Sequence, residues 1–302
     1  MNYIIREVNY GYLLRWFHLN GASFFFFVIY LHILRGLLFH SFRLKNVWWR
    51  GTTIYLILII IAFLGYVLPW GQISLWGATV ITNLFRTIPI IGTLFVTWLW
   101  GGFRVDQPTL RCFYSLHYLL PIVLILLIVV HIMLLHHTGS TSMTIDHSFI
   151  NKIKFHPFFI YKDAINLGFL FLFFSIILIA PYYLGDRENF IPANPLASPV
   201  HIKPEWYFLW AYAILRSIPN KLGGVIALVI ALRFFYLLSF FVFYTPPKID
   251  TTSLTWARFC TVIILLTWLG GNPVEYPYIL LGQIITLNYF FLLSLHILLY
   301  QT

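Results

Sequence analysis

The sequence has 302 residues, of which 60% are hydrophobic and only 9% are Asp, Glu, Lys or Arg. This composition excludes a soluble globular domain and predicts a polytopic membrane protein. The formal net charge is +10, but the basic residues lie at the ends of apolar segments and in loops. We therefore interpret this charge as a feature of membrane topology and expect no nucleic-acid partner.

Seven apolar segments are long enough to cross the ~30 Å hydrocarbon core of a membrane as helices. In chain order they cover residues 13–38, 52–68, 114–135, 167–184, 223–244, 254–270 and 278–300. Their apolar residues run almost without interruption, whereas the strands of a membrane β-barrel alternate. We therefore expect an all-α fold, a polytopic membrane helix bundle of about seven transmembrane helices.

The first and third spans each contain two histidines 14 residues apart, His18 and His32 in one, His117 and His131 in the other. Fourteen residues advance ~21 Å along a helix and end ~40° short of four turns, so each pair shares nearly one face. Consecutive spans alternate in direction, which places His18 level with His117 and His32 level with His131. A lone histidine on an apolar helix is usually a core residue, but ionisable groups at membrane depth are costly and usually functional. The two levels predict two haems in series between these spans.

The second span contains Gly51 and Gly65, which are also 14 residues apart. Glycines at these levels would let the edge of a macrocycle approach the backbone, although glycine also favours ordinary helix packing in membranes. Arg15 and Arg35 each lie about one turn from a histidine of the first span. Each arginine is either a partner for a haem propionate or an anchor that reaches to the membrane interface.

These residues resemble cytochrome b, the haem subunit of ubiquinol–cytochrome c oxidoreductase (respiratory complex III). Five segments carry the resemblance in the family's order: REVNYGYLLRWFHLNGASFFF, YVLPWGQISLWGATVITNL, HIMLLHHTGS, PANPLASPVHIKPEWYFLWAYAILRSIPNKLGG and GNPVEYPY. The chloroplast homologue usually ends after the second haem-binding helix. This chain continues beyond that helix, so the respiratory branch of the family fits better.

The resemblance implies two haem b groups and two domains. His18 and His117 would bind the low-potential haem, and His32 and His131 the high-potential haem. Residues 1–166 would form the haem-binding bundle, and residues 167–302 the C-terminal helices with the loop of the quinol-oxidation site.

The resemblance also implies a pocket that oxidises quinol. Residues 69–78, which include Gly77, and the PEWY segment at 204–207 resemble the wall of this pocket. Quinol oxidation releases two protons and needs an acceptor beside the ring. We expect Glu205 to accept a proton, with Tyr66 and Tyr212 as polar neighbours. A lone glutamate would more simply be a carboxylate at the membrane surface.

A second pocket, which reduces quinone, is implied at the opposite face. His136, Ser140, Lys162 and Asp163 match positions that line it in the family, and the order of the spans places them beyond His131. Quinone reduction takes up two protons, which His136 and Asp163 are suited to donate and relay. Without the resemblance, a solvated loop would be the simpler interpretation of these residues.

The implied function is the bifurcated oxidation of quinol, with one electron passed to quinone and a proton gradient formed. The other electron would go to a Rieske iron–sulfur protein, because Cys112 and Cys260 are too few to hold a cluster. Cytochrome c1, other complex III subunits and membrane lipids are the further partners expected, in a dimeric complex of the mitochondrial inner membrane. The alternative is a non-redox membrane transporter that uses its histidines as a proton relay.

Family members usually have one further membrane helix before the first histidine helix. In this sequence Met1 stands just ahead of REVNYGYLLR. We expect a separate small hydrophobic polypeptide to supply that helix, unless the sequence simply starts late.

Overall fold

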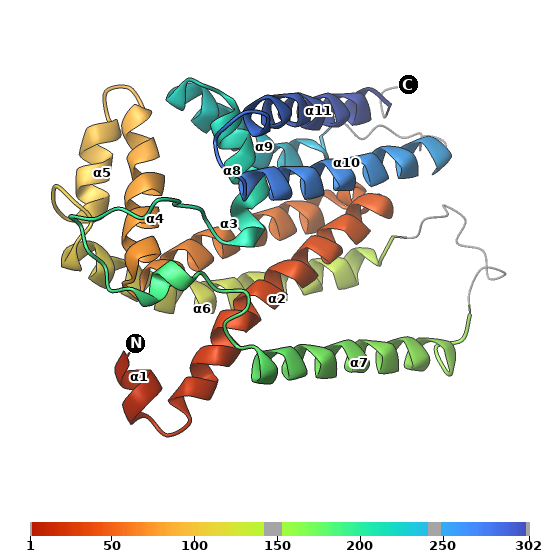
Figure 1. Cartoon of the computed structure of the whole chain (residues 1–302). Helices are drawn as coiled ribbons and strands as arrows, with labels where there is room; N and C mark the ends of the chain where they lie inside the picture. Colours follow the sequence, from red (N-terminus) through yellow and green to blue (C-terminus); the bar gives the residue numbers. More distant parts are fainter. Residues whose placement is uncertain (1, 142–152, 241–248, 300–302) are drawn as a thin grey trace. The chain divides into compact units, whose positions relative to one another are not determined.

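The computed structural model describes residues 2–141, 153–240 and 249–299, which form α-helices and short 3₁₀ turns (Figure 1). The helices are α1 (Asn2–Glu7), α2 (Gly11–Leu38), α3 (Lys45–Val67), α4 (Gln72–Asn83), α5 (Gly92–Trp100), α6 (Gln107–Thr138), α7 (Phe158–Ile179), α8 (Leu209–Ser217), α9 (Lys221–Leu237), α10 (Ile249–Gly270) and α11 (Tyr278–Leu299). The 3₁₀ turns are η1 (Ser41–Arg43), η2 (Leu84–Thr87), η4 (Arg187–Phe190) and η5 (Trp206–Phe208). The expected all-α membrane bundle is confirmed.

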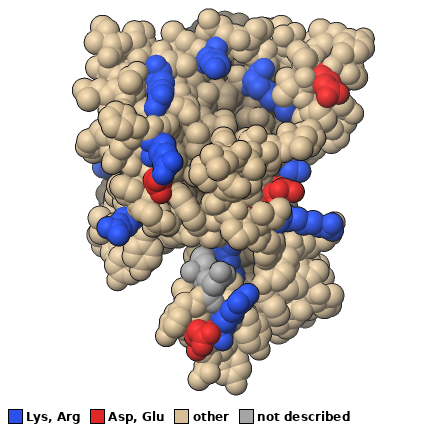
Figure 2. All heavy atoms as spheres, turned by 60° about the vertical axis from the view of Figure 1, so that its left-hand side comes forward, with Lys and Arg blue, Asp and Glu red and all other residues tan. Residues whose placement is uncertain are grey.

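In the described part of the chain, five helices are long and apolar enough to cross a membrane: α2, α3, α6, α7 and residues Tyr278–Leu295 of α11. They coincide with the first four predicted spans and the last. The sixth predicted span is a shorter apolar helix, Leu254–Gly270, within α10. The fifth coincides with α9, which has 17 residues, and its predicted end at residues 241–244 lies outside the described residues. On the face drawn in Figure 2, charged side chains are scattered over a largely uncharged surface.

The helices form two compact units, which are described separately. One consists of Met1–Arg35 and Thr141–Gly185, and the other of Gly36–Ser140 and Asp186–Thr302. The predicted division of the chain at residue 166 stays a prediction.

In the first unit, the N-terminal half of α2 packs antiparallel to the C-terminal end of α7. The Trp16 indole N–H donates to the Tyr182 hydroxyl at 2.8 Å, and the Asn20 amide donates to the Pro181 carbonyl at 2.8 Å. Further along α2, the ring of Phe24 stacks on that of Phe173 with centroids 3.9 Å apart. Aromatic packing supplemented by two polar contacts therefore fixes the register of these helices.

In the second unit, α3 and α6 lie side by side and antiparallel. Phe63 of α3 meets Phe113 of α6 edge to face, with ring centroids 5.8 Å apart. The connection between them is a hairpin of α4 and α5, which packs on the end of α3 through a buried cluster that includes Val67, Leu75 and Trp100. This hairpin closes the end of the unit at which α3 ends and α6 begins.

Hydrogen bonds from buried side chains tie the hairpin to α6. The Trp100 indole N–H donates to the Thr82 hydroxyl at 2.7 Å, and the Thr109 hydroxyl donates to the Trp100 carbonyl at 2.7 Å. Thr82 and Thr109 are both buried, so each of these polar groups needs such a partner. The contacts hold α4, α5 and the first turn of α6 as one block.

The first turn of α6 is also capped. The Asp106 side chain accepts a hydrogen bond from the Gln107 N–H at 2.9 Å, and the Asp106 N–H donates to the Thr109 hydroxyl at 3.3 Å, completing a capping box. The Gln107 N–H and the Arg104 guanidinium hold the pKa of the Asp106 carboxyl below its usual value. The cap fixes the residue at which α6 begins, and with it the height of every side chain along the helix.

The C-terminal helices of the second unit pack through small residues and buried aromatic rings. Gly270, the last residue of α10, lies against the backbone of Leu209 at the start of α8, where a Cβ would fall on the Leu209 carbonyl oxygen. Tyr289 of α11 is fully buried and donates its hydroxyl to the Ala231 carbonyl of α9 at 3.3 Å. Close approach at Gly270 is therefore a condition for this packing.

Replacing Gly270 with Ala should lower the free energy of unfolding by ~1–3 kcal/mol, because the added methyl group overpacks the contact with α8. Gly282→Ala in α11 is the matched control, since a Cβ there has no atom within 4 Å, and it should raise that free energy by ~0.5–1 kcal/mol through helix propensity. Thermal unfolding of the purified protein in detergent measures both. Equal effects of the two substitutions would contradict the close contact at Gly270.

Candidate functional site

The two histidines of α6 face the two glycines of α3. A Cβ on Gly51 would lie 3.1 Å from Cε1 of His131, and a Cβ on Gly65 would overlap Cε1 of His117. Because the helices are antiparallel and both spacings are 14 residues, the two histidines meet the two glycines at two levels. Here the glycines make room for the imidazole rings, a role that neither interpretation of the sequence predicted.

The ring of His117 is oriented by the backbone of α3. Its Nδ1 lies 2.9 Å from the Ile61 carbonyl oxygen. A carbonyl only accepts hydrogen bonds, so Nδ1 carries the proton and donates it, and Nε2 is the unprotonated nitrogen. Metal-ligating histidines are commonly held in this way by a carbonyl at the other ring nitrogen. His117 is therefore suited to bind iron through Nε2, which is the fit that a haem requires.

His18 and His32 lie on the single continuous helix α2 in the first unit. At 100° per residue, both are turned away from the side of α2 that carries Trp16 and Asn20, which contact α7. The side chain of each is exposed. The pairs His18 with His117 and His32 with His131 each join the two units, so the pairing stays a prediction from the sequence. The same holds for Arg15 and Arg35 as partners of haem propionates.

The structure brings together Glu205 and Tyr66, which the sequence predicted as neighbours. Glu205 directly precedes η5 and is only 9% exposed. Tyr66 is the penultimate residue of α3, and its hydroxyl forms a side-chain hydrogen bond with the Glu205 carboxylate. A buried carboxylate with a phenol beside it is able to accept a proton and pass it on.

The backbone around η4 is fastened to the junction between α3 and α4. The Gln72 N–H donates to the Ile191 carbonyl at 3.0 Å, and the Ala193 N–H donates to the Trp70 carbonyl at 3.1 Å. Between them, Gly71 forms an isolated antiparallel bridge with Pro192. A Cβ on Gly71 would overlap the backbone of Asn189, so only glycine allows this approach. The loop that leads to Glu205 is thereby held against the end of α3.

Three polar side chains that the sequence analysis missed complete this junction. The amide of Gln72 donates to the Ala197 carbonyl at 2.9 Å and accepts from the Asn194 N–H at 2.9 Å. Oγ of Ser74, fully buried, lies 2.7 Å from the Tyr66 carbonyl oxygen and 2.8 Å from Oδ1 of Asn189. Gln72 and Ser74 stand inside the PWGQISLWGA segment, so polarity within an apolar motif was the signal available.

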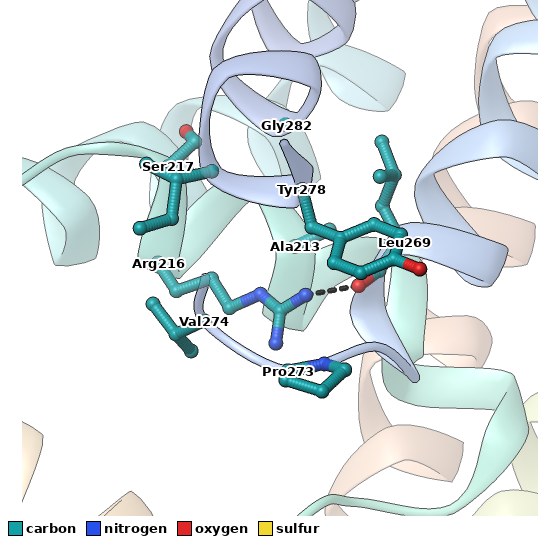
Figure 3. Close-up of a pocket in the computed structure, with 9 residues that line it drawn as sticks. Ala213, Arg216, Ser217, Leu269, Pro273, Val274, Tyr278 and Gly282 are labelled. Atoms are coloured by element: carbon teal, nitrogen blue, oxygen red, sulfur yellow. Dashed lines mark hydrogen bonds between the residues drawn. The ribbon is translucent and has the colours of Figure 1, made fainter. Parts of the chain in front are cut away.

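Two other residues predicted for this pocket have different surroundings. Tyr212 of α8 contacts Arg216, whose guanidinium carbon lies 5.3 Å from the centroid of the tyrosine ring. Arg216 donates to the carbonyls of Leu269 and Asn272 at the end of α10, beside a small pocket (Figure 3). A place for Tyr212 beside Glu205 stays a prediction. Gly77, within α4, has open space where its Cβ would stand.

The residues predicted to reduce quinone come from both units. His136 and Ser140 lie at the exposed end of α6 and just beyond it, in the second unit. Lys162 and Asp163 are exposed near the beginning of α7, in the first unit. Residues 142–152 of the intervening connection lie outside the described residues. A common pocket for the four therefore stays a prediction.

Two family models match the chain. The one described as "Cytochrome b/b6/petB" matches residues 1–139, and the one described as "Cytochrome b(C-terminal)/b6/petD" matches residues 192–290. A solved structure of a "Hyperthermophilic respiratory Complex III" is similar to the chain with a TM-score of 0.88 and 31% sequence identity, over 98% of this chain and 81% of that one. All four histidines fall in the first matched range and Glu205 in the second, while Lys162 and Asp163 lie between the two ranges.

Replacing Gly65 with Ala should displace the His117 ring and break its hydrogen bond to Ile61, because the new methyl group overlaps Cε1. Gly51→Ala is the matched control, since its Cβ would only touch His131 at 3.1 Å. We expect Gly65→Ala to abolish or shift one b-haem absorption band in reduced protein, and Gly51→Ala to leave both bands in place. A Gly65→Ala protein with both bands unchanged would show that Gly65 does not seat His117.

Proposed function

The chain belongs to the cytochrome b family, and from this premise we propose that it is the dihaem subunit of a proton-translocating quinol–cytochrome c oxidoreductase. In this function quinol is oxidised at one membrane face and quinone is reduced at the other. Between the faces, two b haems would supply a one-electron path across the membrane.

The observation that carries the proposal is the pair of histidine seats between α3 and α6. Two imidazoles at a 14-residue spacing each meet a glycine, and His117 presents an unprotonated Nε2. A proton-relay transporter would have no need of histidines held at two fixed levels by glycines. We propose that His18 joins His117 in holding the low-potential haem and that His32 joins His131 in holding the high-potential haem, with Arg15 and Arg35 near the propionates.

At the quinol-oxidising face, we assign proton acceptance to Glu205. Its burial removes competing water, and the hydrogen bond to Tyr66 orients the carboxylate. Gly77 would leave space for the ring of the substrate on α4, and Tyr212 would be a polar neighbour on α8. The network at Gln72 and Ser74 holds this wall in place.

At the quinone-reducing face, we assign proton donation to His136 and Asp163. Both are exposed and therefore in exchange with the aqueous phase that must supply two protons for each quinone. Ser140 and Lys162 would bind the quinone oxygens as hydrogen-bond donors.

The chain's partners in this function follow from what it lacks. Among the described residues, no group of three or more His, Cys, Asp and Glu is placed to hold a metal ion. The second electron of quinol therefore needs an external acceptor, which we propose is a Rieske iron–sulfur protein, followed by cytochrome c1. We propose a dimeric complex with other complex III subunits and bound membrane lipids, located in the mitochondrial inner membrane.

Replacing His131 with Leu should remove only the haem nearer the quinone-reducing face, because the two ligand levels are independent. The measurement is the optical spectrum of purified, dithionite-reduced protein, in which one of two b-type α-bands should disappear. Loss of both bands from a folded protein would contradict separate sites. A wild-type protein without any b-type band would instead support the transporter.

Replacing Glu205 with Gln should slow quinol oxidation severalfold while both haems stay bound, because the amide keeps the shape of the side chain and cannot accept the proton. Steady-state reduction of cytochrome c by quinol measures this rate. Glu7→Gln, an exposed carboxylate in the first unit, is the control. If the Glu205→Gln rate equals that of the wild type from pH 5 to 9, Glu205 is not the acceptor.

A further inference from the structure

A second carboxylate lies near the phenol of Tyr66. The Tyr66 hydroxyl is hydrogen-bonded to Glu205 and interacts electrostatically with Asp186 as well. Asp186 directly precedes η4, 19 positions before Glu205 in the chain. The mechanism described so far uses Glu205 and Tyr66 but leaves the accepted proton inside the protein.

The turn that carries Asp186 has a defined position beside Tyr66. Asp186 Oδ1 accepts from the Glu188 N–H at 2.9 Å, and its carbonyl accepts from the Asn189 N–H at 3.2 Å. The Asn189 side chain then accepts from the Ser74 N–H at 3.0 Å. Because Ser74 also contacts the Tyr66 carbonyl, a short chain of hydrogen bonds joins the Asp186 turn to the end of α3.

Exposure increases from Glu205 outward. Glu205 is buried, Tyr66 and Asp186 are half-buried, and Arg187 and Glu188 are exposed. The three side chains therefore lead from a buried acceptor towards solvent. A gap between the phenol and the second carboxylate is of the kind that one ordered water bridges.

We propose that Asp186 is the residue through which the proton accepted by Glu205 leaves the protein, with Tyr66 as the relay between the two carboxyl groups. The Glu205 carboxyl O–H bond breaks and a new O–H bond forms on the Tyr66 oxygen, while the original Tyr66 proton passes to the Asp186 carboxylate. Asp186 then releases that proton to water. No electron moves in this step, and Glu205 and Tyr66 return to their starting states.

This inference rests on the proposed quinol oxidation. It assigns Asp186 a role that requires an ionisable group, whereas capping η4 requires only an oxygen acceptor. The two roles are separable by substitution, because Asn and Ser cap a turn as Asp does but do not take up a proton near neutral pH.

The experiment uses the intact complex reconstituted in vesicles that contain a pH-indicator dye on the side of the Asp186 turn. Quinol oxidation is started in a single turnover, and the rates of b-haem reduction and proton release are recorded together. Asp186→Asn should slow proton release about tenfold, since a positioned acid or base commonly contributes that much or more to a proton transfer. The solvent deuterium isotope effect on turnover should rise with it.

Three variants complete the test. Glu188→Gln removes the exposed carboxylate of the same turn and should behave as wild type. Asp186→Glu should restore most of the rate, and Asp186→Ser should reproduce the Asn result should the amide fail to assemble. Wild-type proton release and isotope effect in Asp186→Asn or Asp186→Ser would overturn the proposal. Absence of haem reduction in the unmodified complex would instead overturn the proposed function.

Discussion

The antiparallel contact between α3 and α6 is the constraint on which the rest of the second unit depends. Two helices that cross a membrane approach closely only where small residues permit it, and here each close approach also places an imidazole. Gly65 does so without spare room, because a Cβ there would overlap Cε1 of His117. The carbonyl of Ile61, one turn earlier in α3, then fixes the ring's proton on Nδ1. Packing and ligand chemistry are thus decided by the same few atoms.

At the end of α3 the constraint changes from steric to polar. Gln72 and Ser74 are buried, and a buried polar group without partners is costly. Their partners are supplied by residues 189–197, more than 110 positions later in the chain. Satisfying these groups therefore holds the loop before Glu205 in one place. Polar residues in an apolar region here specify position, as satisfied networks commonly do.

The sequence was sufficient for features that depend on local pattern. Long apolar runs predicted α2, α3, α6, α7 and α11, and the equal spacings predicted that histidines and glycines would share levels. The helical hairpin of α4 and α5 was read only as a long connection, because its helices are short and its stability comes from contacts such as Trp100 with Thr82. The role of Gly71 was also hidden, since it depends on Asn189, a partner that no local pattern reveals. Likewise, α9 is shorter than its apolar segment suggested.

Gly65 and Tyr66 are consecutive residues, and this adjacency connects the two chemistries of the site. They point about 100° apart on α3, one towards His117 of α6 and the other towards Glu205. A helix interior is stiff over one residue, so a shift that moves the histidine seat also moves the phenol. The group suited to ligate iron and the group that bonds the proton acceptor are therefore held at a fixed separation. Such rigidity suits an oxidation in which the electron and the proton of one substrate leave in different directions, because neither path then has to be rebuilt in each turnover.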